Sequence, residues 1–134
     1  MSFTFSPRSL AAMSGVHPRL RKALDEAIKT VDFTVICGQR GRAAQNAAFR
    51  AGTSKARFGS SPHNFSPALA IDFIPSPFKG WNDTKAFKRV ADAIVAAGAR
   101  VGVELEAGYT FKTIIDWPHI QLKGWKALRG KPAE

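Results

Sequence analysis

Two histidines and one aspartate in polar segments of this sequence are of the types that a catalytic zinc ion takes from protein. His63 and Asp72 lie in the segment SSPHNFSPALAIDF, and His119 lies in IIDWPHIQL. Two imidazoles and one carboxylate leave the fourth tetrahedral position of zinc free for water or substrate. Asp116, three residues before His119, is placed to carry the proton that a zinc hydrolase must move. These residues predict zinc-dependent hydrolysis, and we interpret the chain as a peptidase.

Taken singly, each of these residues is a weak signal. An isolated aspartate at a strand end is usually a solvent-facing turn residue, and an isolated histidine is more often structural than a ligand. The set is stronger, because the chain has three histidines and two of them lie in polar segments with a carboxylate each. The third, His17, precedes Pro18 near the start of a predicted helix, and we expect it to be a surface or local packing residue.

Length and composition indicate a globular protein of one domain. The chain has 134 residues, of which 45% are hydrophobic and 22% charged, so we expect residues 1–134 to form a single domain. Its one cysteine, Cys37, excludes an intramolecular disulfide, and in the apolar run FTVIC we expect a buried structural thiol. The first residues, MSFTFSPRSL, lack the features of a secretory signal, and no segment approaches the roughly 20 apolar residues of a membrane span. We expect a monomer made in a cytosol, without stable membrane insertion.

The formal net charge of +10 indicates a polyanionic partner. Nucleic acid and the bacterial cell wall both meet that description. The basic residues are dispersed along the chain and form no recognisable nucleic-acid motif. We therefore expect no nucleic-acid binding and regard most of these residues as a solvated surface.

The apolar pattern alternates between helical and strand spacing, which predicts an α+β fold with a small antiparallel sheet packed with helices. Residues 16–29, 42–52 and 84–97 are predicted helices. Predicted strands cover residues 33–37, 68–74, 100–105 and 119–122. Residues 53–67 form a loop by composition, and residues 123–134 are expected to be a frayed basic tail.

Strand alternation explains how the proposed zinc site is assembled on the sheet. In ALAIDFI, Asp72 shares a face with Ala68 and Ala70, which keep the surface around the carboxylate clear. In HIQL, His119 faces the same side as Gln121, so its imidazole reaches Asp72 if the two strands are neighbours. We predict that pairing.

Several segments resemble the zinc-dependent D-alanyl-D-alanine carboxypeptidase and dipeptidase family, which includes the L-alanyl-D-glutamate endopeptidases that bacteriophages use as endolysins. The matching segments are Ser61-Pro62-His63, Ala70-Ile71-Asp72, Asp116-Trp117-Pro118-His119, VHPRL (residues 16–20) and DFTVICGQRGRAAQN (residues 32–46). They cover nearly the whole chain in order. The resemblance implies a fold of the D-alanyl-D-alanine peptidase or hedgehog-like type.

The sequence departs from the family pattern at two points. Asp72 follows His63 by nine positions, two more than in the pattern, and Ala68 occupies the place of the family glycine. A surface loop absorbs such an insertion without moving its ends. Many relatives have glutamate where this chain has Asp116, and in this respect the chain resembles the phage endopeptidase branch more closely.

The resemblance also implies roles for the residues. Zn²⁺ held by His63, Asp72 and His119 supplies a Lewis acid and lowers the pKa of water to roughly 7. Asp116 takes the proton of that water and returns it to the departing amine. Arg40 is implied to lie against the developing oxyanion or a substrate carboxylate, and Arg42 is the alternative residue for that role. Ser61 is implied to contact the substrate or to support the His63 loop.

Three classes of function follow. We expect a peptidoglycan peptidase that cuts the bond between L-alanine and D-glutamate, with a carboxypeptidase or dipeptidase acting on D-alanyl-D-alanine as the enzymatic alternative. A catalytically silent wall-binding or virion module is the second class, and the presence of Asp116 argues against it. A nucleic-acid-binding protein is the third. For an endolysin we expect a location in the host cytoplasm, followed by action on the wall after release.

Overall fold

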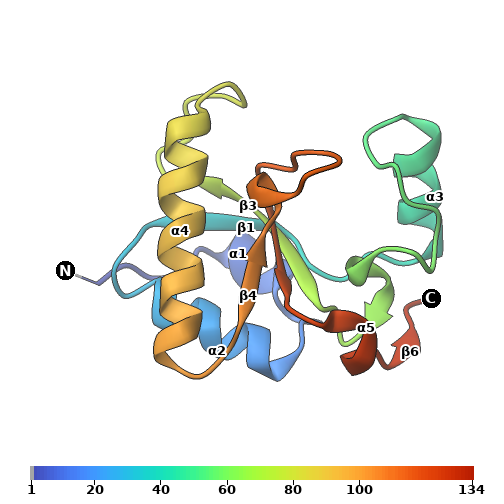
Figure 1. Cartoon of the computed structure of the whole chain (residues 1–134), viewed down its shortest axis with the longest axis horizontal. Coiled ribbons are helices and arrows are strands. Elements are labelled where there is room, and N and C mark those ends of the chain that lie inside the picture. Colours follow the sequence, from blue (N-terminus) through green and yellow to red (C-terminus); the bar gives the residue numbers. More distant parts are fainter. Residues whose placement is uncertain (1) are drawn as a thin grey trace.

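A four-stranded antiparallel sheet forms the centre of the protein, and the computed structural model describes residues 2–134 (Figure 1). In spatial order its strands are β1 (Phe33–Cys37), β3 (Ala70–Pro75), β5 (His119–Leu122) and β4 (Leu105–Ala107). A separate two-stranded sheet pairs β2 (Phe65–Ser66) with β6 (Lys131–Pro132). The predicted α+β class with a small antiparallel sheet is confirmed.

The helices pack around this sheet and differ in what they contact. They are α1 (Pro7–Ala12), α2 (Pro18–Ala27), α3 (Arg42–Arg50), α4 (Thr84–Arg100), α5 (Trp125–Leu128) and the 3-10 turns η1 (Pro62–Asn64) and η2 (Gly108–Thr110). Helix α4 packs against α2 and against strands β3 and β4, whereas α1 packs on β1. In Figure 1, α3 lies on the opposite side of the molecule from α4, close to the small β2–β6 sheet.

The helix boundaries follow from ordinary capping chemistry. Pro18 occupies the first turn of α2, where its missing N–H needs no partner, and His17 caps the helix by accepting a hydrogen bond from the Arg19 N–H at Nδ1 (3.1 Å). His17, expected to be a surface or local packing residue, is half-buried and has this local structural role. Helix α4 buries Phe87 and Ile94 on its apolar face in the core formed with the sheet.

The predicted strand over residues 100–105 is largely wrong. Helix α4 continues to Arg100, and the chain then turns at Gly102, whose φ of 77° lies in the left-handed region that favours glycine. Only Leu105 of the predicted range belongs to β4. The helix extends further because the apolar helical spacing does not stop at Gly98, which is buried against Leu105.

The C-terminal segment is ordered, so the predicted frayed tail is also wrong. Strand β6 pairs with β2, and the Ala133 N–H donates to the Asn64 carbonyl at 2.7 Å. Ala133 is buried, and Trp125 of α5 packs against Phe65. The tail lies against the residues that immediately follow His63, and β2 occupies part of the longer stretch between His63 and Asp72.

This docking predicts a measurable contribution of the last four residues to stability. Deleting residues 131–134 removes the β2–β6 pairing and the Ala133 hydrogen bond, and we expect the free energy of unfolding to fall by about 1–3 kcal/mol. Urea denaturation followed by tryptophan fluorescence measures this change. The matched control is Lys131→Ala, which keeps the backbone pairing and should unfold like the parent protein. Equal stability of the deletion variant and the parent would contradict the docked tail.

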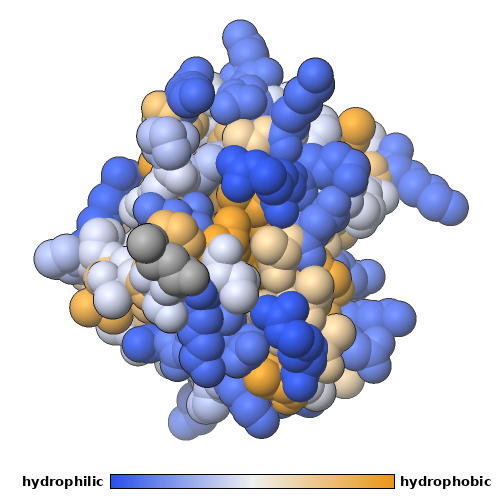
Figure 2. Space-filling model, turned by 90° about the vertical axis from the view of Figure 1, so that its left-hand side faces the viewer, coloured by the Kyte–Doolittle hydropathy of each residue, from blue (hydrophilic) through white to orange (hydrophobic). Residues whose placement is uncertain are grey.

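The face on the left of Figure 1 is predominantly hydrophilic, with a narrow band of apolar side chains near its centre (Figure 2). The described residues include no helix with both the length and the apolar character needed to cross a membrane.

Candidate metal centre

Strand pairing places Asp72 and His119 directly opposite each other. In the antiparallel register of β3 and β5, Asp72 pairs with His119 and Ala70 pairs with Gln121. On the other side of β3, a bulge in β1 after Val35 brings Cys37 opposite Asp72. The predicted pairing of these strands is confirmed, and it fixes two of the predicted ligands on rigid backbone.

His63 reaches the sheet from the short turn η1, which a capping box holds. The Ser61 hydroxyl accepts a hydrogen bond from the His63 N–H (3.2 Å), and the Asn64 carboxamide oxygen accepts one from the Ser61 N–H (3.2 Å). The buried Asn64 also donates to the Arg40 carbonyl (3.1 Å), while the Arg40 N–H donates to the His63 carbonyl (2.7 Å). These contacts tie the His63 turn to the segment after β1.

Asp116 is held beside the sheet by a close approach to Gly108. The Asp116 N–H donates to the Gly108 carbonyl at 3.1 Å, and the His119 N–H donates to the Asp116 carbonyl at 3.2 Å. A Cβ atom at position 108 would lie 2.2 Å from the Asp116 carbonyl oxygen and 2.8 Å from the His119 Cβ. Only glycine therefore allows the loop that carries Asp116 to pack this closely against η2.

Asp72 lies at the centre of the predicted site. Its Oδ1 is 3.4 Å from His63 Nε2 and 3.5 Å from His119 Nδ1. Asp116 Oδ2 is 3.8 Å from the same Nδ1 of His119. The structure thus brings His63, Asp72, Asp116 and His119 together, although they span more than fifty positions of the chain.

The outward nitrogen of each imidazole has its own hydrogen-bond partner. His63 Nδ1 is 2.7 Å from the Gly38 carbonyl oxygen, and His119 Nε2 is 2.7 Å from Oε1 of Gln121. Gln121 in turn donates to Glu106 Oε1 at 3.0 Å, across the β4–β5 pair. With a proton on each outward nitrogen, the inward nitrogens can offer their lone pairs to a cation bound beside the Asp72 carboxylate. Metal-binding histidines are oriented by such acceptors.

The charges of the cluster depend on one another. Burial lowers the pKa of His63, but the adjacent Asp72 carboxylate outweighs this effect and raises the pKa to about 10. Burial raises the pKa of Asp72, but the two imidazoles outweigh it and hold the pKa well below its usual value. A divalent cation would take the place of the His63 proton as the partner of the Asp72 carboxylate.

Asp116 differs from Asp72 in its electrostatic environment. Burial raises the pKa of Asp116; the His119 imidazole opposes this rise and the Asp72 carboxylate adds to it. The Asp116 side chain keeps about half of its surface exposed, at 48%, whereas that of Asp72 is 18% exposed. A raised pKa and access to solvent are properties of a group that exchanges protons with water.

The remaining predicted residues occupy different positions around this cluster. Arg40 lies against it, with one guanidinium nitrogen 3.3 Å from Asp72 Oδ2 and the other 3.0 Å from Gln45 Oε1. Ser61 caps the His63 turn and lines the cleft into which the cluster opens, which is described below. Arg42 is exposed and lies over the ring of Phe58 at 4.4 Å from its centroid, outside the set of described residues that line the cleft.

Cys37 was expected to be a buried structural thiol, but it is only half-buried and lies next to the cluster. Its sulfur is 4.0 Å from His63 Nδ1 and 3.6 Å from a guanidinium nitrogen of Arg40. Two groups of side chains in the described residues have donor atoms close enough to share a metal ion: Cys37 with His63 and Asp72, and Asp72 with Asp116 and His119. The alternation of residues in β1 did not predict the position of Cys37 near the cluster, because the bulge between Val35 and Cys37 shifts the strand register.

Sequence reasoning also gave no role to Gln45, Asn64 or Gln121, which hold the site together. The Gln121 contact had a signal in the sequence, because strand alternation places residues 119 and 121 on one face. Gln45 had none, since its hydrogen bonds join segments that are distant in sequence, and the same holds for the contacts of Asn64 with Arg40 and Gln45.

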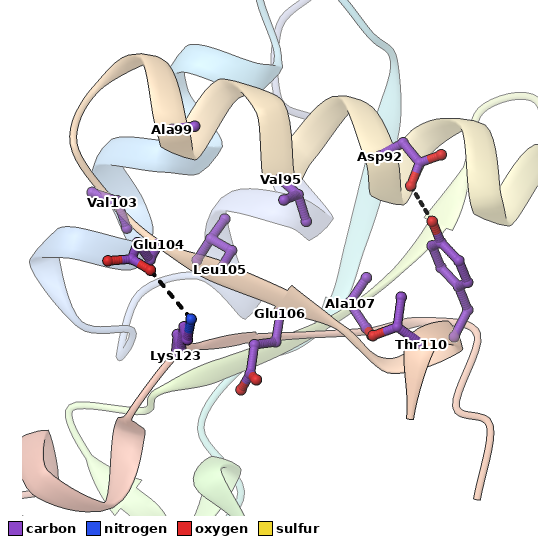
Figure 3. Close-up of a pocket in the computed structure, with 11 residues that line it drawn as sticks. Asp92, Val95, Ala99, Val103, Glu104, Leu105, Glu106, Ala107, Thr110 and Lys123 are labelled. Carbon is purple, nitrogen blue, oxygen red and sulfur yellow. Dashed lines mark hydrogen bonds and ion pairs between the residues drawn. The ribbon is translucent and has the colours of Figure 1, made fainter. Parts of the chain in front are cut away.

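The cluster opens into a cleft of about 520 Å³ between the loop after α3 and the loop before β5. A second concavity of about 430 Å³ lies between α4 and β4 and is drawn in Figure 3. That concavity is lined by apolar side chains such as Val95 and Leu105, with the ion pair of Glu104 and Lys123 at one end. No histidine is among the described residues that line this concavity, so the candidate metal ligands lie in the first cleft.

An α+β fold that carries a cluster of imidazoles and carboxylates in an open cleft is of the kind that metal-dependent hydrolases use. Comparison with known proteins agrees with this class. The model of the phage L-alanyl-D-glutamate peptidase family matches residues 1–123. The chain belongs to this family, as the motifs in its sequence predicted.

Two relatives illustrate the similarity. The chain is 33% identical over 129 residues to the L-alanyl-D-glutamate peptidase of Escherichia phage T5, covering 92% of this chain and 91% of that protein. The crystal structure of the L-Ala D-Glu endopeptidase ChiX of Serratia marcescens superimposes with a TM-score of 0.73 at 32% identity, covering 88% of each chain. The similarity therefore extends over both sequence and fold.

Proposed function

We propose that this protein is a zinc-dependent endopeptidase that hydrolyses the bond between L-alanine and D-glutamate in the stem peptides of bacterial peptidoglycan. Family membership and the activities for which both relatives are named support the substrate. The arrangement of the two imidazoles supports a bound metal ion. A hydrogen bond at the outward nitrogen of each ring orients it so that the inward nitrogen faces Asp72.

The donor types at the site, imidazole nitrogens and carboxylate oxygens, are those that zinc binds. We assign His63 Nε2, His119 Nδ1 and Asp72 Oδ1 as ligands, which is a donor set that catalytic zinc sites use. We prefer this set to one that contains Cys37, because its sulfur lies near the outward Nδ1 of His63, which the Gly38 carbonyl already engages. When bound, zinc polarises the scissile carbonyl and lowers the pKa of water.

The protein side chains supply proton transfer and charge stabilisation. Asp116 takes a proton from the attacking water and returns it to the amine of D-glutamate as the peptide bond breaks. Arg40, held by Gln45 and Asp72, places a fixed positive charge beside the cluster, where negative charge develops on the carbonyl oxygen. Ser61 maintains the turn that presents His63.

The biological setting follows from the same proposal. As an endolysin, the protein would be made in the host cytoplasm, act as a monomer and reach the wall after release. Its net charge of +10 would favour association with an anionic wall.

Digestion of purified peptidoglycan with the zinc-loaded protein, followed by mass spectrometry of the fragments, tests this function. We expect soluble peptides with D-glutamate at a new N-terminus, and glycan strands on which only L-alanine remains of each cleaved stem peptide. A matched sample treated with a chelator should release no peptides, and added zinc should restore release. Release of D-alanine alone would instead favour a carboxypeptidase, and no product at all would favour a silent wall-binding module.

A further inference from the structure

The two walls of the cleft differ in chemistry. The loop before β5 contributes an apolar wall that includes Phe111, Ile114 and Ile115, and the two isoleucines are 50% and 56% exposed. The loop after α3 contributes hydroxyl groups and one cation, Lys55, to the opposite wall. In Figure 1 these loops rise on either side of the end of the sheet. A negatively charged substituent of a substrate in this cleft gains nothing from the apolar wall, whereas Lys55 on the opposite wall can pair with it.

Lys55 is the cleft cation that is free to bind a substrate. Arg40 and Lys55 are the lysine and arginine side chains among the described residues that line the cleft. Arg40 is paired with Asp72, whereas no ion pair in the part of the chain that the structure describes involves Lys55. A carboxylate that enters the cleft therefore meets one cation without a partner.

Gln45 ties the residues on both sides of Lys55 to the site. The fully buried carboxamide of Gln45 donates to the Ala56 carbonyl (2.7 Å) and to the Ser54 hydroxyl (3.0 Å), which are the two neighbours of Lys55. Its oxygen accepts hydrogen bonds from the Arg40 guanidinium (3.0 Å) and from Asn64 (3.0 Å). The position of Lys55 is thereby coupled to the residues that hold Arg40 and the His63 turn.

We propose that Lys55 is a specificity-determining residue that binds the free α-carboxylate of the D-glutamate residue next to the scissile bond. This inference rests on the proposed function, because it assumes a stem-peptide substrate. D-Glutamate continues the stem peptide through its γ-carboxyl group, so its α-carboxylate remains free beside the bond that is cut. Lys55 therefore distinguishes stem peptides with this carboxylate from those in which it is an amide, since only the former presents a charge.

The test compares two soluble stem peptides that differ only at this group, one with the α-carboxylate and one with the α-amide. We expect zinc-loaded parent protein to cleave the carboxylate peptide with a kcat/KM about 10-fold higher, as for a hydrogen bond between charged groups. Lys55→Met should lower kcat/KM for the carboxylate peptide to the level of the amide peptide, and Lys55→Glu should reverse the preference. Lys79→Met, an exposed lysine outside the cleft, is the matched control and should behave like the parent.

The outcomes separate the proposal from the function on which it rests. Equal cleavage of both peptides by the parent, or an unchanged preference in Lys55→Met, overturns the role of Lys55 and leaves the peptidase function intact. Failure of the parent to cleave either peptide overturns the proposed function, and the specificity with it. Because Lys55 is exposed on a loop, its replacement should leave the thermal unfolding temperature unchanged, which circular dichroism verifies.

Discussion

Asp116→Asn is expected to reduce hydrolysis of stem peptides by about 10²–10⁴-fold while the protein still binds one zinc ion per chain. Asparagine has nearly the same shape as aspartate and keeps the backbone contacts to Gly108 and His119, but it cannot accept and return a proton. Single-turnover rates measure the first effect, and metal analysis after dialysis measures the second.

Zinc retention is the informative part of this experiment. Asp116 Oδ2 lies 3.8 Å from His119 Nδ1, and Asp72, Asp116 and His119 have donor atoms close enough to share a metal ion. Loss of zinc from Asp116→Asn would therefore make Asp116 a ligand and contradict its role as proton carrier. Asp83→Asn, at the start of α4, is the matched control for removal of one carboxylate and should be fully active.

Asp72→Asn is expected to abolish both zinc binding and activity. Asp72 is the residue that both imidazoles and Arg40 contact, at 3.3–3.5 Å. Changes in groups that merely orient a ligand already weaken metal binding 10- to 100-fold, so removal of a charged ligand should exceed about 100-fold. Competition with a chromophoric chelator measures zinc affinity, and activity should fall to that of the chelated parent.

Cys37→Ser provides the comparison for this variant. If His63, Asp72 and His119 hold the metal, the serine variant should retain zinc with nearly unchanged affinity, because the Cys37 sulfur lies on the outward side of His63. Strong loss of zinc from Cys37→Ser would instead indicate the alternative donor group of Cys37, His63 and Asp72. Far-ultraviolet circular dichroism of both variants separates loss of metal from loss of fold.

Local periodicity and composition account for what could be predicted about the fold. Helical spacing located α2 and the start of α4, and alanine content with a terminal glycine indicated α3. Strand alternation located β3 and β5, and a short β-branched run indicated β1. The errors fall where local pattern is ambiguous: at the end of α4, where helical spacing continues past Gly98, and in the C-terminal segment, whose composition is that of a tail. That segment is ordered because β2 offers it a partner, and β2 lies more than sixty positions earlier.

For the site, the sequence by itself determined which side chains are chemically able to hold a metal and which of them share a strand face. His119 and Asp72 were expected on neighbouring strands, and the register of β3 and β5 pairs them directly. Side chains alternate between the two faces of a strand, so a few residues suffice to predict which side chains share a face of the sheet. His63 and Asp116 were selected by residue type and position in the sequence, and the family motifs contain both in the same order.

Only the tertiary structure decided how these side chains are held and what surrounds them. The hydrogen bonds of Gln45 and Asn64, the approach of Cys37 through a bulge, and the position of Lys55 opposite an apolar wall all join segments that are separate in sequence. Such contacts depend on where packing places whole elements, and no local pattern encodes them. The sequence therefore supplied the candidate ligands of the site, while the fold determined their orientation and their cleft.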